Sequence, residues 1–128
     1  VKRVREEEMA KILIVDDSVS MRQMVTFTLE GVGHEVDQAE DGVQALDMAK
    51  GQQYEMVLTD VNMPNMDGIE MTRQMRQVDG YQFLPILTLT TEASDDKKMA
   101  GRDAGATGWI VKPFSPDKLL ATVNKLLG

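Results

Sequence analysis

The sequence predicts an α/β protein with a doubly wound, five-stranded parallel sheet and helices on both faces. Five short apolar runs alternate along the chain with five segments in which apolar residues recur at helical spacing. Most of the runs are apolar at successive positions, as in strands that are buried on both faces. Because crossovers between parallel strands are right-handed, alternating strands and helices favour a doubly wound sheet.

The first half of the chain is expected to contain three strands and two helices. The strands are predicted at residues 11–15, 35–39 and 55–59, of which the second has the weakest pattern. Apolar spacing and the glycines that follow predict helices at residues 18–29 and 42–49. A turn-rich segment, residues 62–68, follows the third strand. Asp41 and Asp67 are interpreted as turn and helix-cap residues.

The second half is expected to contain three helices and two strands. Apolar residues between Ile69 and Val78 predict a third helix, and a fourth helix is predicted at residues 94–104, capped by Ser94. The last helix begins with an N-cap, a proline and an acid at residues 115–117, and its apolar face reaches Leu127. The remaining two strands are predicted at residues 85–89 and 107–111.

Composition restricts the class of protein. The 128 residues suffice for one packed core, which we expect at residues 9–128, after a charged leader at residues 1–8 that is disordered or derives from cloning. The net charge of −7 argues against a nucleic-acid partner. No apolar run reaches the roughly 20 residues of a membrane span, and no cysteine is available for disulfides or thiolate metal sites. We expect a cytoplasmic monomer with no membrane contact.

Polar side chains follow four of the predicted strands at the point where each strand ends. Asp16 and Asp17 follow the first strand, Asp60 the third, Thr90 the fourth and Lys112 the fifth. Because the carboxyl ends of parallel strands lie at one edge of a sheet, we expect these side chains to converge on one crevice. Asp16 and Asp17 could instead simply cap the following helix, but that interpretation leaves Asp60 unexplained.

Three converging carboxylates repel one another unless a cation neutralises them. Oxygen ligands without histidine or cysteine suit a hard divalent cation, and a site that keeps several waters favours Mg²⁺ over Ca²⁺. A carboxylate, a hydroxyl and a lysine beside Mg²⁺ are the groups that phosphoryl transfer requires. Asp60 can then act as the nucleophile and form an aspartyl phosphate.

With these five residues at successive strand ends and Lys112 followed by Pro113 and Phe114, the sequence resembles the receiver domain of two-component response regulators. The resemblance extends from Ala10 to the last residue, and it is strongest to the stand-alone, CheY-like chemotaxis regulators. It implies a flavodoxin-like fold. It also implies that a histidine kinase of the chemotaxis type phosphorylates the protein, which then binds a downstream protein such as the flagellar switch or another phosphorelay member.

The resemblance implies a role for each site residue. Asp60 would be the phosphoacceptor. Asp17, Asp60 and the backbone carbonyl of Asn62 would bind Mg²⁺ directly, and Asp16 would act through water. Asn62 and Glu92 match the pair of residues that tunes dephosphorylation in CheY-like proteins.

Lys112 would pair with the phosphoryl group, and the Thr90 hydroxyl would hydrogen-bond to it. Movement of Thr90 would draw Trp109 inward and switch the face formed by the fourth helix, the fifth strand and the fifth helix. Lys98 and Lys118 are assigned to the same partner face. Trp109 stands where the best-known chemotaxis proteins carry tyrosine, and a packing role for it is an equal alternative.

Two other functions stay open. The protein could be a phosphate sink or a phosphorelay intermediate without contact to the flagellar motor. It could also be a hydrolase with an aspartyl-phosphate intermediate. The haloacid-dehalogenase-like phosphatases, however, use an Asp-x-Asp motif, and this chain has Asp60-Val61-Asn62.

Overall fold

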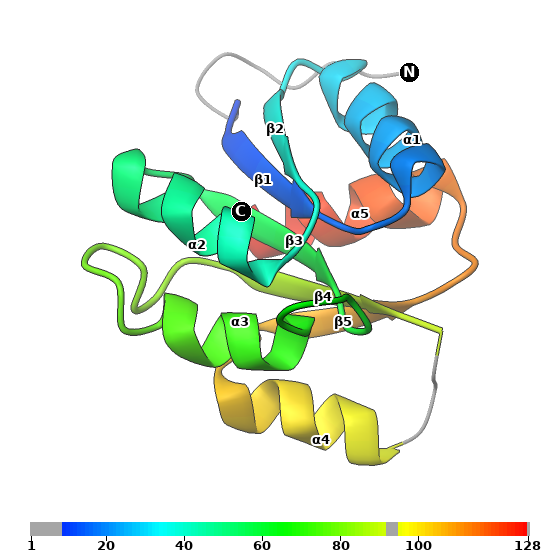
Figure 1. Ribbon diagram of the computed structural model, residues 1–128. Helices are drawn as coiled ribbons and strands as arrows, with labels where there is room; N and C mark the ends of the chain where they lie inside the picture. Colours follow the sequence, from blue (N-terminus) through cyan, green and yellow to red (C-terminus); the bar gives the residue numbers. More distant parts are fainter. Residues whose placement is uncertain (1–8, 92–94, 128) are drawn as a thin grey trace.

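Five parallel strands form a single sheet in the order β2-β1-β3-β4-β5 (Figure 1). The computed structural model describes residues 9–91 and 95–127. The strands are β1 (Lys11–Val15), β2 (Glu35–Ala39), β3 (Met56–Asp60), β4 (Ile86–Thr90) and β5 (Gly108–Val111). The helices are α1 (Val19–Glu30), α2 (Gly42–Gly51), α3 (Gly68–Met75), α4 (Asp95–Ala104) and α5 (Pro116–Leu127). The predicted fold class is therefore confirmed.

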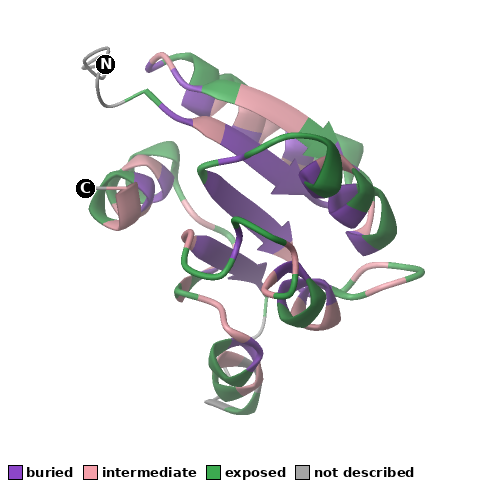
Figure 2. Cartoon of the chain, turned by 90° about the vertical axis from the view of Figure 1, so that its left-hand side faces the viewer, coloured by how far each residue is buried: buried purple, intermediate pink, exposed green. Residues whose placement is uncertain are grey.

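The sheet is buried on both faces, so each face has its own apolar core. Ile12 and Ile14 of β1 point into one core, which α1 and α5 cover. Leu13 and Val15 point into the other core, which side chains of α2 and α3 complete. Figure 2 shows the central strands as buried, and Figure 1 shows α1 and α5 on one side of the sheet and α2, α3 and α4 on the other. The successive apolar positions of the strands are explained by this two-sided burial.

The strand order places β1 and β3 at the point where the chain reverses the direction in which it builds the sheet. β1 pairs with β2 on one side and with β3 on the other, and Val15 lies opposite Thr59. The residues that follow these two positions, Asp16 and Asp60, are therefore neighbours. In doubly wound sheets, ligands bind outside the carboxyl ends of the strands at such a switch point.

The structure confirms Asp41, Asp67 and Ser115 as the helix caps that the sequence predicts, whereas Ser18, which was expected inside the first helix, is its N-cap. Ser18, Asp41 and Asp67 each accept a hydrogen bond from a backbone N–H in the first turn of α1, α2 and α3, respectively. Ser115 accepts from the N–H of Lys118 at the start of α5 (3.1 Å). The predicted cap Ser94 lies outside the described residues.

Several predicted boundaries are wrong by a few residues. The largest error concerns α3, which ends at Met75 although the apolar pattern continues to Val78. The N–H of Val78 bonds to the carbonyl of Met75 (3.0 Å) in a turn, and Gly80 then takes a positive φ of 89°. Val78 therefore packs against the core from a turn and not from a helix.

Smaller errors concern strand and helix ends. β3 includes Asp60 and β4 includes Thr90, whereas both residues were expected just after their strands. α2 continues through Gly51, and β5 begins at Gly108. Among the helices of residues 9–91 and 95–127, none combines the length and the apolarity needed to cross a bilayer.

Candidate active site

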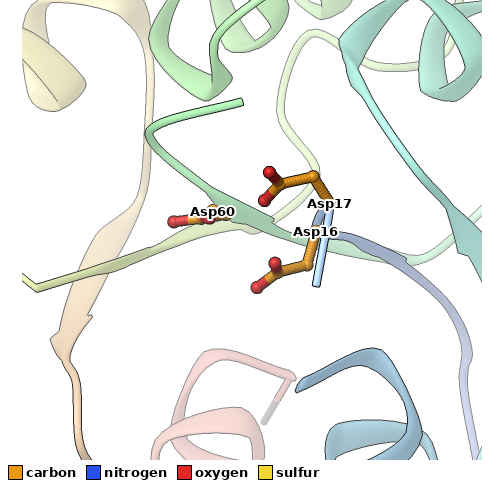
Figure 3. Close-up of side chains that lie close together, drawn as sticks. All are labelled: Asp16, Asp17 and Asp60. Atoms are coloured by element: carbon orange, nitrogen blue, oxygen red, sulfur yellow. The ribbon is translucent and has the colours of Figure 1, made fainter. Parts of the chain in front are cut away.

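Three carboxylates meet at the carboxyl ends of β1 and β3. One oxygen from each of Asp16, Asp17 and Asp60 lies within 4.8 Å of the others. Figure 3 shows the three side chains next to one another, extending in the same general direction. Asp16 is fully buried, Asp60 is partly buried and Asp17 is exposed, so the cluster reaches from the protein interior to solvent.

Lys112 is the cation of this cluster. Its Nζ lies 3.1 Å from Asp16 Oδ2 and 3.4 Å from Asp60 Oδ1. The backbone N–H of Lys112 donates to the carbonyl of Thr90 (2.7 Å), which extends the pairing of β4 with β5 by one residue and places the lysine above the sheet edge. The ammonium group thus pairs with two of the three carboxylates, and the site retains an excess of negative charge.

The position of Asp16 is fixed by several hydrogen bonds. Its Oδ1 accepts from the N–H of Ser18 (2.8 Å), and its own N–H donates to the carbonyl of Ala39 (3.1 Å). Its carbonyl accepts from Nη1 of the buried Arg22 (2.6 Å). Arg22 was not among the residues predicted from the sequence. A signal was available, because Arg22 lies on the same helical stripe as the buried Val25 and Leu29.

Asp60 is held in a less favourable environment for a charge. Burial raises the pKa of Asp60, the nearby Asp16 carboxylate raises it further, and Lys112 acts in the opposite direction. The Val61 N–H donates to Asp60 Oδ1 (2.8 Å). Gly68 at the start of α3 packs so closely that a Cβ there would lie 1.9 Å from the Asp60 carbonyl oxygen. Only glycine fits at position 68, a requirement that the sequence pattern did not reveal.

The donor set fits the Mg²⁺ ion that the sequence predicts. All three clustered ligands are carboxylates, hard oxygen donors that suit Mg²⁺. The exposure of Asp17 leaves room for the water molecules that Mg²⁺ usually retains. Asn62 lies two residues beyond Asp60 in the loop between β3 and α3, and it is exposed.

The remaining predicted residues lie around this cluster or apart from it. Thr90 is buried at the end of β4. Trp109 on β5 is 45% exposed, and the Nζ of Lys98 on α4 lies 5.2 Å from the centre of its ring. Lys118 is exposed on α5. Glu92 lies outside the described residues.

This chain is similar in sequence and in structure to known proteins. The model of the response regulator receiver domain family matches residues 12–124. A chemotaxis protein CheY homologue from Campylobacter jejuni is 38% identical over 120 residues, which cover 92% of each protein. The structure of the chemotaxis protein CheY4 of Vibrio cholerae is similar with a TM-score of 0.90 and 50% identity, covering 92% of this chain and 98% of that one.

A third relative carries a metal ion. The receiver domain of the sensor histidine kinase PA1611 from Pseudomonas aeruginosa has a magnesium ion coordinated in its active-site cleft. It is similar with a TM-score of 0.87 and 28% identity, covering 94% of this chain and 98% of that one. The family match over most of the chain, the fold and the acidic cluster beside a lysine lead to one conclusion. This chain belongs to the response regulator receiver domain family and is of the CheY-like type.

Proposed function

We propose that Asp60 accepts a phosphoryl group from a histidine kinase in a Mg²⁺-dependent reaction. The observation that supports this most directly is the position of its carboxylate at a strand end, beside two further carboxylates and 3.4 Å from Lys112 Nζ. Phosphoryl transfer depends mainly on the positioning of the reactants and on charge neutralisation, and such a cluster provides both.

In the proposed reaction, an Asp60 oxygen attacks the phosphorus atom of a phosphohistidine. A new P–O bond forms, the P–N bond breaks, and its electron pair returns to the imidazole of the kinase, which takes up a proton. Among the described residues, both Val61 and Lys112 contact Asp60 through Oδ1. Oδ2 is therefore the oxygen that we assign to the attack.

Mg²⁺ would be held by Asp17, Asp60 and the backbone carbonyl of Asn62, with Asp16 acting through water. When bound, the ion would supply positive charge to the phosphoryl oxygens. The cluster has an excess of negative charge even with Lys112 present, so a divalent cation is favoured there electrostatically. The magnesium-containing receiver domain from Pseudomonas aeruginosa supports the choice of metal.

Two pairs of residues would act after phosphorylation, one by contacting the phosphoryl group and the other by orienting a water molecule. Lys112 would pair with the phosphoryl group after transfer, and the Thr90 hydroxyl would donate a hydrogen bond to it. Asn62 and Glu92 would orient the water that later hydrolyses the aspartyl phosphate, so that the protein catalyses both its own phosphorylation and its own dephosphorylation.

We place the output of the protein in chemotaxis, in the cytoplasm, because two similar proteins are named for chemotaxis. The partner face would be formed by α4, β5 and α5, including Lys98, Trp109 and Lys118. Trp109 is nearly half exposed and the Lys98 ammonium faces its ring, so both are accessible to a partner. Phosphorylation would shift the population of two states of this face.

Phosphorylation of Asp60 can be tested without the cognate kinase. Incubation with acetyl phosphate and Mg²⁺ should add one phosphoryl group to the wild-type protein, detected by intact-protein mass spectrometry, and none to Asp60→Asn. Asp47→Asn, which alters an exposed carboxylate on α2, is the matched control and should be modified like the wild type. Stable modification of Asp60→Asn would refute the assignment.

The chemotaxis output can be separated from the phosphate-sink alternative by a pull-down with the flagellar switch protein. If the proposed output holds, beryllofluoride, which mimics the phosphoryl group on Asp60, should strengthen binding. Binding that does not respond to beryllofluoride would favour a sink or relay.

A further inference from the structure

We infer that Asp41 and Asn65 form a positioning pair that holds the loop between β3 and α3 where Asn62 can present its backbone carbonyl to Mg²⁺. The inference rests on the proposed metal site. It concerns neither a metal ligand nor a reacting group, but a hydrogen bond between two loops that flank the acidic cluster.

The bond is formed by a carboxylate that also caps a helix. Asp41 Oδ2 accepts from Asn65 Nδ2 (2.8 Å), and Asp41 Oδ1 accepts from the N–H of Gln44 in the first turn of α2 (2.9 Å). The pKa of Asp41 is lowered, first by the Gln44 N–H and then by Asn65. The carboxylate is therefore ionised at neutral pH, which strengthens both hydrogen bonds.

Asn65 adopts an unusual backbone conformation to make this contact. Its φ is +69°, in the left-handed region, and it is the single non-glycine residue with a positive φ in the described part of the chain. Asparagine tolerates this region better than most residues. The conformation turns the loop back toward α2, where the Asn65 amide meets Asp41.

Packing beside the hydrogen bond brings the same two segments together. A Cβ added to the buried Gly42, the first residue of α2, would lie 3.0 Å from both Cβ and Cγ of Met66. Gly42 therefore leaves the space that Met66 occupies. The loop is in van der Waals contact with the start of α2 next to the Asp41–Asn65 bond.

Besides this bond, the loop is held at its two ends and by Met63 and Met66, which pack against the apolar core. Asp60 belongs to β3, and the N–H of Gly68 donates to the carbonyl of Val61 (2.8 Å), so the loop is closed at its base. For residues 62–66, the Asn65–Asp41 bond is the only hydrogen bond to another segment within the described residues. Without it, the base of the loop would stay closed while the part that carries Asn62 would be less restrained.

Two single variants each remove one partner of the Asp41–Asn65 hydrogen bond and preserve the local backbone structure. Asn65→Gly retains a residue that adopts positive φ readily but removes the amide. Asp41→Ser retains a good N-cap for α2 but shortens the side chain, so that it no longer reaches Asn65. Each variant should bind Mg²⁺ more weakly in a calorimetric titration, by at most about fivefold, which is the equilibrium effect of losing one hydrogen bond of average strength.

A double variant tests whether the hydrogen bond itself is responsible. Asp41→Asn with Asn65→Asp reverses donor and acceptor, and both residues suit their positions, as an N-cap and in the left-handed region. The Mg²⁺ affinity should return to within about twofold of the wild type. Thermal unfolding without metal should show that every variant is fully folded at the temperature of the titration, so that a loss of Mg²⁺ affinity is not a loss of folded protein.

The titrations distinguish a failure of the positioning role from a failure of the proposed metal site. Wild-type Mg²⁺ affinity in both single variants, or a loss that the reversed pair does not restore, would overturn the positioning role and leave the proposed function intact. A wild-type protein that binds no Mg²⁺ would overturn the proposed metal site, and this inference with it.

Discussion

Polar side chains are arranged differently at the two ends of the parallel strands, here called the amino edge, where the strands begin, and the carboxyl edge, where they end. Toward the amino edge, two buried tyrosines form hydrogen bonds: the Tyr54 hydroxyl donates to Asp37 (2.7 Å), and the Tyr81 hydroxyl donates to the carbonyl of Gln52 (2.6 Å). At the carboxyl edge, three carboxylates face one another. One edge contributes stability through completed hydrogen bonds, whereas the other retains repulsion that a ligand can relieve.

The cations of the two edges show the same difference. Arg76, at the end of α3, donates to the backbone carbonyls of Tyr81, Leu84 and Gly105 at 2.6–3.0 Å. It thereby joins the loop between α3 and β4 to the loop between α4 and β5. Lys112 instead pairs with side-chain carboxylates that belong to the candidate active site. The comparison predicts that substitutions at the amino edge change stability, and that substitutions at the carboxyl edge change function.

The largest effect on stability is expected for Arg76→Met. Removing the guanidinium leaves three carbonyls without these donors and should lower the free energy of unfolding by about 3 kcal/mol, measured by urea denaturation. Modification by acetyl phosphate should be unchanged at a temperature where the variant is folded. Arg73→Met, which removes an exposed pair with Glu70, is the matched control and should cost under about 0.5 kcal/mol. Loss of modification in folded Arg76→Met would contradict the prediction that substitutions at the amino edge change stability but not function.

Asp60→Asn is expected to have an intermediate effect on stability and to raise the free energy of unfolding, whereas Arg76→Met lowers it. Because burial and Asp16 raise the pKa of Asp60, folding disfavours its charged form, and the neutral amide should be tolerated better. In the presence of a chelator, the variant should be about 1 kcal/mol more stable than the wild type. Added Mg²⁺ should then stabilise the wild type more than the variant. A metal-free variant that is less stable than the wild type would contradict the idea of retained repulsion.

The smallest effect concerns pH and His34 at the amino edge. His34 Nδ1 accepts from the N–H of Ala10 (3.1 Å), whereas its buried Nε2 has no hydrogen-bond partner among the described residues. Burial lowers the pKa of His34, and Glu55 opposes this effect. The neutral form is therefore favoured on folding. Its contribution is present above the ordinary histidine pKa of about 6.5 and is lost as the pH falls below it. Between pH 7 and 5, the wild type should lose more stability than His34→Gln, as measured by urea denaturation at the two pH values. Equal losses of stability in the two proteins would show that His34 does not contribute to the pH dependence of stability.

Much of the fold and of the site could be predicted from local sequence signals. Strand and helix patterns are local, and so are caps such as Asp41 and Asp67, which act within one turn of their own helices. The convergence of Asp16, Asp60 and Lys112 followed from topology, because parallel strands bring their carboxyl ends to one edge.

The errors and omissions arose where packing between distant segments decides. The apolar spacing through Val78 suggested a longer α3, but the chain turns at Arg76, whose guanidinium bonds to loops up to 29 residues away. Asp41 was assigned its cap but not its second bond to Asn65, which is 24 residues further along the chain.

The sequence by itself determined the order of the elements and the set of residues at the strand ends, because both depend on local periodicity and on the handedness of crossovers. Only the tertiary structure decided that Gly68 must lack a side chain against the Asp60 carbonyl, that Arg22 holds Asp16 and that Asn65 reaches Asp41. Those contacts join segments whose separation in space is set by the packed fold, and no local pattern encodes that distance.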